Sequence, residues 1–351
     1  MKILIPAEKE IFLDDKNANP FIALLYDGLR QKGFDVVCDL KEFWDNGQNY
    51  DVVFFQWPEA VFRWRDAIPQ RFEACLERLK GKGVKVIATC HNLHAHSNDN
   101  QANLLYDILY AHADAIHHLG MFSYHLFLHR YPNCHHFVAE HPIFFDITAL
   151  QLHQNECRKR LSLPMRKKMI LAFGAFRNRE EKQLFLSLAD GQLGSDVIFV
   201  APRLDHELGL VQGWHWERSL VHLYKRVMLK WKGVYCRRGL VERDDVPAYF
   251  AAADVVFIQR LDILNSGNVP LAFSASKVVV GPDMGNVGEL LKATGNPCFD
   301  VSSPDDAILK CRDALALTKE GRIGEANYQY AQRNMLPQHF IDTIADHLSA
   351  L

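Results

Sequence analysis

The stretch Asp262-Ile-Leu-Asn-Ser-Gly-Asn-Val-Pro270 follows an apolar run over residues 255–258 and leads into a segment with helical spacing. A strand that passes through a short polar turn into a helix is the repeating unit of a doubly wound parallel sheet. Ser266 can cap the helix, Gly267 lets a ligand approach the backbone, and Pro270 is tolerated in the first turn. The unpaired N–H groups of that turn favour an anion beyond the strand end. The alternative is an ordinary strand-to-helix turn that binds nothing.

The same strand, turn and helix unit recurs along the chain. Short β-branched runs alternate with amphipathic segments over residues 2–139, and the alternation restarts over residues 169–281. This pattern predicts an α/β protein with parallel sheets that carry helices on both faces. A polar, basic stretch at 151–168 separates the halves, so we expect two doubly wound domains joined near residue 160. Ligands of such sheets bind beyond the carboxyl ends of the strands, here in a cleft between facing domains.

The composition argues against several classes of partner. The 351 residues are 48% hydrophobic, which suits about two well-formed cores. The formal charge of −2 and a pI near 6.8 predict no binding to nucleic acid. Eight scattered cysteines without a Cys-x-x-Cys motif are typical of reduced thiols in a cytoplasmic protein. Because no signal peptide or membrane-spanning apolar run is present, we expect a cytoplasmic protein and leave peripheral association with the inner face of the cell membrane open.

A second anion-binding turn lies earlier in the chain, in Phe173-Gly-Ala-Phe-Arg177-Asn-Arg-Glu-Glu-Lys182. Gly174 permits a tight turn beside a bound nucleotide, Arg177 lies in the loop, and Lys182 falls in the first helical turn. Cations there are mildly unfavourable for the helix itself, which favours a ligand role, although Glu180 and Glu181 can simply offset Lys182.

Both turns together suit a diphosphate. Two helix N-termini, a guanidinium and an ammonium group would stabilise the charge that develops on a departing nucleoside diphosphate. We expect no metal, because the chain carries no Asp-x-Asp pair. The loop that includes Leu240 and Val241 follows another predicted strand, and we expect its backbone to hold the nucleotide base.

Histidines follow a strand of the first half directly. His91, Asn92 and His94 come after the predicted strand 85–89, at the ligand-facing end of that strand. If the diphosphate belongs to a nucleotide sugar, we expect His91 to contact the reacting sugar. We expect Asn92 and His94 to contact the acceptor of that sugar. A metallohydrolase site built on His91, His94 and His96 is a rival interpretation, although the spacing to the next acidic residue misses the usual ligand pattern.

Further acceptor-binding candidates occur in the first half. Trp57 could stack on a sugar and Glu59 could bind a hydroxyl, since both follow the predicted strand 52–56. A half-buried Trp that closes the sheet is an equally plausible interpretation. Asn19 caps the first long helix at Asn19-Pro20 and would border the acceptor side.

These motifs together resemble family 4 of the glycosyltransferases. The resemblance implies the GT-B architecture, with a Rossmann-like acceptor domain at 1–155, a nucleotide-sugar domain at 156–327, and helices at about 328–351 that return to the first domain. It further implies a metal-independent, retaining hexosyltransferase that uses a nucleoside-diphosphate sugar as co-substrate, no other cofactor, and a glycan or lipid-linked acceptor. The motifs that carry it are His91-Asn92, Glu140-His141-Pro142, Gly174-x-x-Arg177 with Lys182, Ser266-Gly267-Asn268 and Lys277-Val-Val-Val-Gly-Pro.

Roles follow from the resemblance. Arg177, Lys182 and the segment Ser266-Gly267-Asn268 would hold the diphosphate, while His91 and Asp262 would lie at the reacting sugar. The chain departs from the family at its Glu-x7-Glu pair, where Ile263 and Leu271 stand instead of acidic residues. Three alternatives with the same architecture therefore remain besides the transferase: a nucleotide-sugar epimerase, a phosphorylase, and a sugar-binding protein without catalytic activity.

Overall fold

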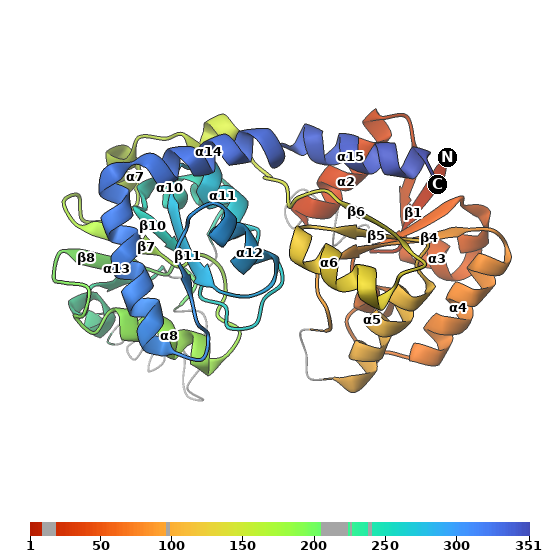
Figure 1. The fold of residues 1–351 in the computed structure, drawn as a ribbon, viewed down its shortest axis with the longest axis horizontal. Helices are drawn as coiled ribbons and strands as arrows, with labels where there is room; N and C mark the ends of the chain where they lie inside the picture. The colour runs from red at the N-terminus through yellow and green to blue at the C-terminus, as the bar shows by residue number, and fades with distance from the viewer. Residues whose placement is uncertain (9–18, 96–98, 205–223, 225–226, 238–240) are drawn as a thin grey trace. The chain divides into compact units, whose positions relative to one another are not determined.

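The computed structural model describes residues 1–8, 19–95, 99–204, 224, 227–237 and 241–351. The chain divides into two units, one formed by Met1–Phe144 with Asn334–Leu351 and the other by Phe145–Arg333. Each unit contains a six-stranded sheet in which every described strand pair is parallel. The predicted α/β class with two parallel sheets is confirmed (Figure 1).

The sheet of the first unit has the strand order β2-β1-β3-β4-β5-β6. Its strands form where apolar and β-branched residues are continuous, because both faces of the sheet are covered. The strands are β1 (Lys2–Ile5), β2 (Asp35–Cys38), β3 (Val52–Phe55), β4 (Lys85–Cys90), β5 (Ala115–His118) and β6 (His135–Val138). The helices are α2 (Pro20–Gln31), α3 (Leu40–Asn46), α4 (Pro69–Gly81), α5 (Asn100–His112), α6 (Met121–Arg130) and α15 (Pro337–Ser349).

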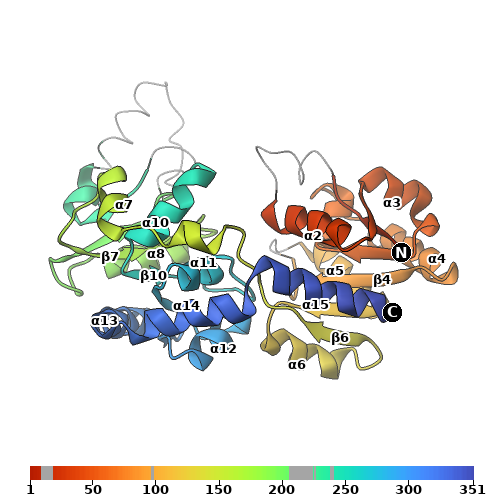
Figure 2. The same ribbon diagram turned by 90° about the horizontal axis from the view of Figure 1, so that it is seen from above.

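The last helix of the chain belongs to the core of the first unit. Helix α15 packs beside α2, and both contribute residues to one apolar cluster on the sheet (Figure 2). Gly28 makes this close approach possible, since a Cβ added there would lie 2.5 Å from Cγ1 of Ile341. A larger residue at this position would push the two helices apart.

The sheet of the second unit has the order β12-β11-β10-β7-β8-β9. From β7 the chain adds β8 and β9 on one side, and it then returns to form β10 on the other side of β7. The winding therefore reverses between β7 and β10. The strands are β7 (Lys168–Leu171), β8 (Val197–Val200), β9 (Val234–Tyr235), β10 (Val255–Phe257), β11 (Val278–Pro282) and β12 (Cys298–Phe299). The helices are α7 (Gln154–Arg160), α8 (Arg179–Leu188), α10 (Val246–Ala252), α11 (Asn268–Ser274), α12 (Gly285–Ala293), α13 (Pro304–Glu320) and α14 (Arg322–Asn334).

The reversal point decides where a ligand can bind in the second unit. In open parallel sheets a crevice forms beyond the carboxyl ends of the two strands where the winding reverses. The two turns singled out in the sequence follow β7 and β10, which are these strands. Across the described ranges, no helix has both the length and the hydropathy to cross a membrane.

Candidate functional site

The turn after β7 is built around Gly174. Its φ of +100° lies in the left-handed region that favours glycine, so the chain can reverse sharply behind the strand. Asn178 then caps α8, since its side-chain oxygen accepts a hydrogen bond from the backbone N–H of Glu181 at 2.8 Å. Arg177 is exposed in the loop before α8, and Lys182 is half-buried in the first turn of that helix.

Glu181 organises this turn, a role that the sequence reasoning missed. Glu181 is 1% exposed, and its carboxylate accepts the backbone N–H of Arg177 at 2.6 Å and pairs with Nη1 of Arg260 at 2.8 Å. The sequence alone suggests only that Glu181 offsets the charge of Lys182. The signal was present as Asn178-x-x-Glu181, the spacing of a capping box, whose acidic member turns back onto the chain before the helix.

The turn after β10 differs from the prediction by one residue. Helix α11 begins at Asn268, and its N-cap is Gly267 rather than Ser266. The Ser266 hydroxyl accepts the backbone N–H of Asn268 at 3.4 Å, so it contacts the same turn from one position further out. Gly267 already has helical dihedral angles, so the Ser266 hydroxyl still accepts from the second residue with such angles, as a capping side chain does.

The structure brings the two turns together. The Asn268 side-chain amide donates to the carbonyl of Phe173 at 2.7 Å, and Nη1 of Arg177 lies 3.4 Å from the carbonyl of Asp262. Gln259, which is 2% exposed at the end of β10, donates to the carbonyl of Ala175 at 3.1 Å. The turns after β7 and β10, with Arg177, Asp262 and Asn268, therefore lie together at the reversal point and are braced by Gln259, a residue that the sequence reasoning overlooked.

A third turn supports the site from the side of β11. Gly285 has a φ of +60°, and a Cβ there would lie 2.6 Å from the carbonyl oxygen of Ile263. The neighbouring Asn286 donates to the side-chain oxygen of Asn265 at 2.7 Å. These contacts hold the segment between Asp262 and Ser266 against the start of α12.

The electrostatics of this site are dominated by guanidinium groups. The Arg177 side chain is exposed by its surface area, yet desolvation by neighbouring atoms and the Arg260 guanidinium lower its pKa, while Glu181 and Asp262 act in the opposite direction. A bound anion would relieve the repulsion between the two guanidinium groups. Val241 is half-buried ahead of α10, whereas Leu240 lies outside the described residues.

In the first unit, His91 and Trp57 lie at the carboxyl edge of the sheet. Their rings stack at a centroid distance of 4.2 Å with an interplanar angle of 16°, and Phe21 meets His91 edge-on at 4.6 Å. Nε2 of His91 lies 3.0 Å from the side-chain oxygen of Gln56. The structure thus places two predicted residues side by side, with Trp57 half-buried and His91 8% exposed.

Glu59 is buried and Asn92 is half-buried in the first unit. Burial raises the pKa of Glu59, and burial together with Glu59 raises the pKa of Tyr106. The Asn92 side chain donates to the Tyr106 hydroxyl at 3.2 Å, and the Tyr110 hydroxyl donates to the Asn92 carbonyl at 2.7 Å. These contacts position the turn after β4.

The remaining candidates of the first unit are dispersed. The Asn19 side chain accepts the backbone N–H groups of Phe21 and Ile22 at 3.0 and 3.4 Å, and so caps α2 as expected. His94 is exposed, and His96 lies outside the described residues. In the parts of the chain that the structure describes, no three His, Cys, Asp or Glu side chains gather as metal ligands would.

No protein-family model and no curated protein sequence matches this chain. Similar solved structures nevertheless cover its whole length. A sucrose-phosphate synthase from Thermosynechococcus elongatus has a TM-score of 0.72 at 12% identity and covers 99% of this chain and 98% of its own. HepE of Anabaena, in complex with UDP and glucose, has a TM-score of 0.72 at 13% identity and covers 100% of both chains.

A trehalose-6-phosphate synthase studied for glycosyl transfer with retention has a TM-score of 0.65 at 11% identity, and it covers 100% of this chain and 99% of its own. Its fold and those of the other two structures are that of the GT-B glycosyltransferases, and the chain therefore has the GT-B fold predicted from the sequence.

Proposed function

We propose that this protein is a metal-independent glycosyltransferase. It moves a hexose from a nucleoside-diphosphate sugar to a hydroxyl group of a glycan or a lipid-linked acceptor, with retention of the anomeric configuration. The observation that carries the proposal is that the turns after β7 and β10 lie together at the reversal point. Arg177 contacts the carbonyl of Asp262 there, and the Asn268 side chain donates to the carbonyl of Phe173 in the other turn.

The donor would bind in the second unit. Arg177 and Lys182 would contact the diphosphate together with the backbone of residues 266–268, and Gly174 lets the nucleotide approach the turn after β7. As the bond to the sugar breaks, negative charge grows on the leaving diphosphate, and fixed cations stabilise that charge more than they stabilise the bound donor. Arg260 lies next to Arg177, and its pairing with Glu181 fixes the guanidinium group and the turn in place.

The acceptor would bind in the first unit. His91 would contact the reacting sugar, Trp57 would stack on the acceptor, and Asn19, Asn92, His94 and Glu59 would border it. Retention needs no protein base when the leaving diphosphate takes the proton of the attacking hydroxyl. The HepE complex with UDP and glucose and the retaining trehalose-6-phosphate synthase support this assignment by their fold.

Binding of UDP and UDP-glucose, measured by titration calorimetry, tests the donor site. Arg177→Ala and Lys182→Ala should each weaken UDP binding by about tenfold or more, because each removes a charge-assisted contact to the diphosphate. Arg166→Ala is the matched control, since Arg166 is exposed and precedes β7, at the opposite end of this strand. Unchanged UDP affinity in both site variants would contradict the proposal.

Turnover separates the transferase from enzymes of the same architecture. Release of UDP from UDP-glucose should require an added acceptor hydroxyl. An epimerase would convert the donor without any acceptor, and a phosphorylase would require inorganic phosphate. Either result with full UDP affinity would replace the transferase assignment and leave the donor site in place.

A further inference from the structure

Trp64 of the first unit lies at the surface, beside the residues that would bind the acceptor. It is 50% exposed, the highest value among the large apolar residues in the described part of this unit. Its ring centroid lies 6.3 Å from that of Trp57, with an interplanar angle of 48°. Trp57 in turn stacks on His91 at a centroid distance of 4.2 Å. The three rings therefore form a series of contacts that begins at buried His91 and ends at exposed Trp64.

This series of rings lies beyond the carboxyl ends of the strands. The 3₁₀-helix η2 (Pro58–Phe62) follows β3 and leads directly to Trp64. The preceding residue, Arg63, forms an ion pair with Glu8, in which Nε lies 2.6 Å from Oε1. Glu8 follows β1, the neighbour of β3 in the sheet, so this pair joins two loops at the same edge. The exposed indole is thus at the end of the unit where parallel sheets bind their ligands.

The backbone is strained where it presents Trp64. Arg63 has a φ of +55° and Trp64 a φ of +57°, and among the described residues no other two consecutive non-glycine residues have positive φ. Bulky side chains are disfavoured in this region, because their Cβ crowds the following carbonyl oxygen. The backbone N–H of Trp64 donates to the carbonyl of Glu59 at 3.0 Å, which holds the turn. Strain of this kind gathers at ligand-binding sites.

The residues next to Trp64 in sequence are charged and exposed. Arg63, Arg65 and Asp66 all reach the surface, so the indole is flanked by groups that donate and accept hydrogen bonds. A ligand that matches such a surface has an apolar face and a polar rim. A pyranose ring has this character, since its C–H groups form a face and its hydroxyl groups surround it. Trp combines a large apolar ring with a polar N–H group and suits contact with such a molecule.

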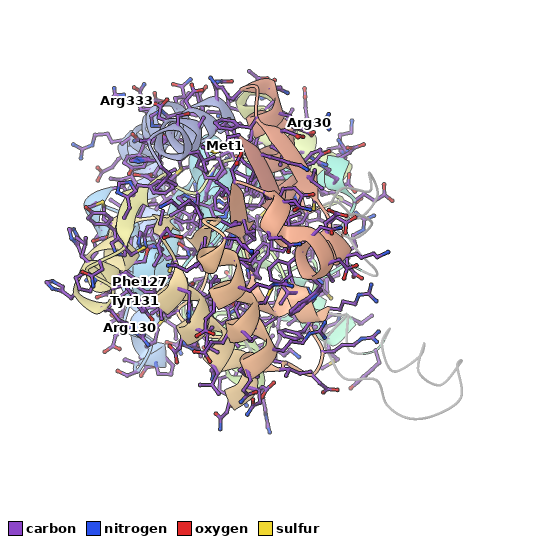
Figure 3. All side chains as sticks on the ribbon, turned by 90° about the vertical axis from the view of Figure 1, so that its right-hand side faces the viewer. Met1, Arg30, Phe127, Arg130, Tyr131 and Arg333 are labelled. Carbon is purple, nitrogen blue, oxygen red and sulfur yellow. The ribbon has the colours of Figure 1, made fainter. Side chains whose placement is uncertain are left out.

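Trp64 is separate from the largest group of exposed apolar side chains in the described part of this unit. That group lies on α6, which packs against β5 and β6 at the other end of the sheet. Figure 3 shows Phe127, Arg130 and Tyr131 of that region together at the margin of the view. Because Trp64 follows β3 and has charged neighbours, it is not the border of an apolar patch.

We propose that Trp64 and Trp57 form a saccharide subsite, in which the indole of Trp64 stacks on a pyranose of the acceptor. This pyranose lies further from the reacting hydroxyl than the sugar at Trp57, because Trp64 is the ring of the series that is furthest from His91. The inference rests on the proposed function and deepens it, since it assigns the acceptor as a glycan of at least two sugar residues.

A glycan array that carries oligosaccharides together with their terminal monosaccharides tests the subsite, with UDP present. The intact protein should bind at least one oligosaccharide about tenfold more tightly than the matching monosaccharide. Trp64→Ala should remove this difference, because it deletes the stacking surface. Trp231→Ala is the matched control, since Trp231 is 83% exposed in the second unit. Equal oligosaccharide binding by Trp64→Ala and the control, or no oligosaccharide binding by the intact protein, would overturn the proposal.

Two further variants separate the loss of the ring from a disturbed turn. Trp64→Gly accepts the positive φ without strain, so the turn persists and the oligosaccharide preference should still be lost. A glycine variant that keeps this preference would contradict stacking on Trp64. Trp64→Phe retains an aromatic face and should keep most of the affinity, and a loss as large as that of the alanine variant would also contradict stacking.

Two controls identify the occupant of the subsite and protect the donor site from confusion with it. Self-association of the intact protein in sedimentation equilibrium that Trp64→Ala abolishes would assign the indole to a second copy of the chain and overturn the proposal. UDP affinity in calorimetry should be the same in all Trp64 variants. Lost saccharide binding with full UDP affinity therefore concerns this subsite alone, and a failure of the donor site is recognised separately.

Discussion

The carboxyl edges of the two sheets follow the same folding rule but carry different chemistry. In the second unit the edge holds Arg177 and Arg260 around the buried carboxylate of Glu181. In the first unit it holds the stacked rings of Trp57 and His91. The parallel sheet places both sets of residues beyond its strands, and only the turn sequences differ. The comparison supports the proposal that a charged ligand group binds to the second unit and an uncharged one to the first.

The pH dependence of stability should separate the two units most strongly. Burial lowers the pKa of His117 to about 4, that of His141 to about 4 and that of His118 to about 2, the last with a contribution from His136. These residues stay neutral in the folded first unit, whereas the unfolded chain binds protons below about pH 6.5. Their contribution to stability is therefore complete above that pH, and each loses about 1.4 kcal/mol per pH unit as the pH falls towards 4.

Urea unfolding between pH 7.5 and 5 measures this dependence. We expect the transition of the first unit to move to lower urea concentration on acidification, while that of the second unit moves less. His118→Asn should flatten the dependence by about 1.4 kcal/mol per pH unit. Equal acid sensitivity in both units would show that these histidines do not set the difference.

Loss of the Glu181 carboxylate should cause the next largest effect, confined to the second unit. Glu181→Ala leaves the largely buried Arg260 guanidinium without its partner and removes the acceptor for the backbone N–H of Arg177. We expect a cost of about 3 kcal/mol in unfolding free energy. Glu181→Gln keeps an acceptor oxygen and should cost less. Thermal unfolding that is the same for the alanine variant and the parent protein would show that the pair is not needed for the turn.

The two helix caps offer the smallest and most evenly matched test. Asn19 caps α2 of the first unit and Asn178 caps α8 of the second, each through its side-chain oxygen. Replacement of either by Ala should cost about 1 kcal/mol of unfolding free energy. Only Asn178→Ala should also weaken UDP binding in calorimetry, because this cap holds the turn that carries Arg177. If Asn19→Ala weakened UDP binding equally, the donor would not be confined to the second unit.

The repeated strand and helix pattern predicted the two sheets because each element is encoded locally, by apolar runs and by helical spacing. The turns after β7 and β10 were also found in the sequence, since Gly174 and Gly267 mark them. Their matching chemistry predicted that the two turns share one diphosphate, but the hydrogen bond between them depends on β10 lying next to β7, which local pattern does not encode. Gln259 was overlooked for the same reason, as its partner Ala175 comes from a distant segment, and so was the pairing of Glu181 with Arg260.

The close contact between Gly28 and Ile341 has a consequence for the order in which the two units fold while the chain is being synthesised. The first unit begins with residue 1 but is completed only by residues 334–351, after the whole second unit has been translated. Until then its sheet lacks helix α15, and the apolar surface that this helix covers stays open to water. The second unit, which is continuous in sequence, can fold first on the ribosome, and the first unit must wait until residues 334–351 have been synthesised.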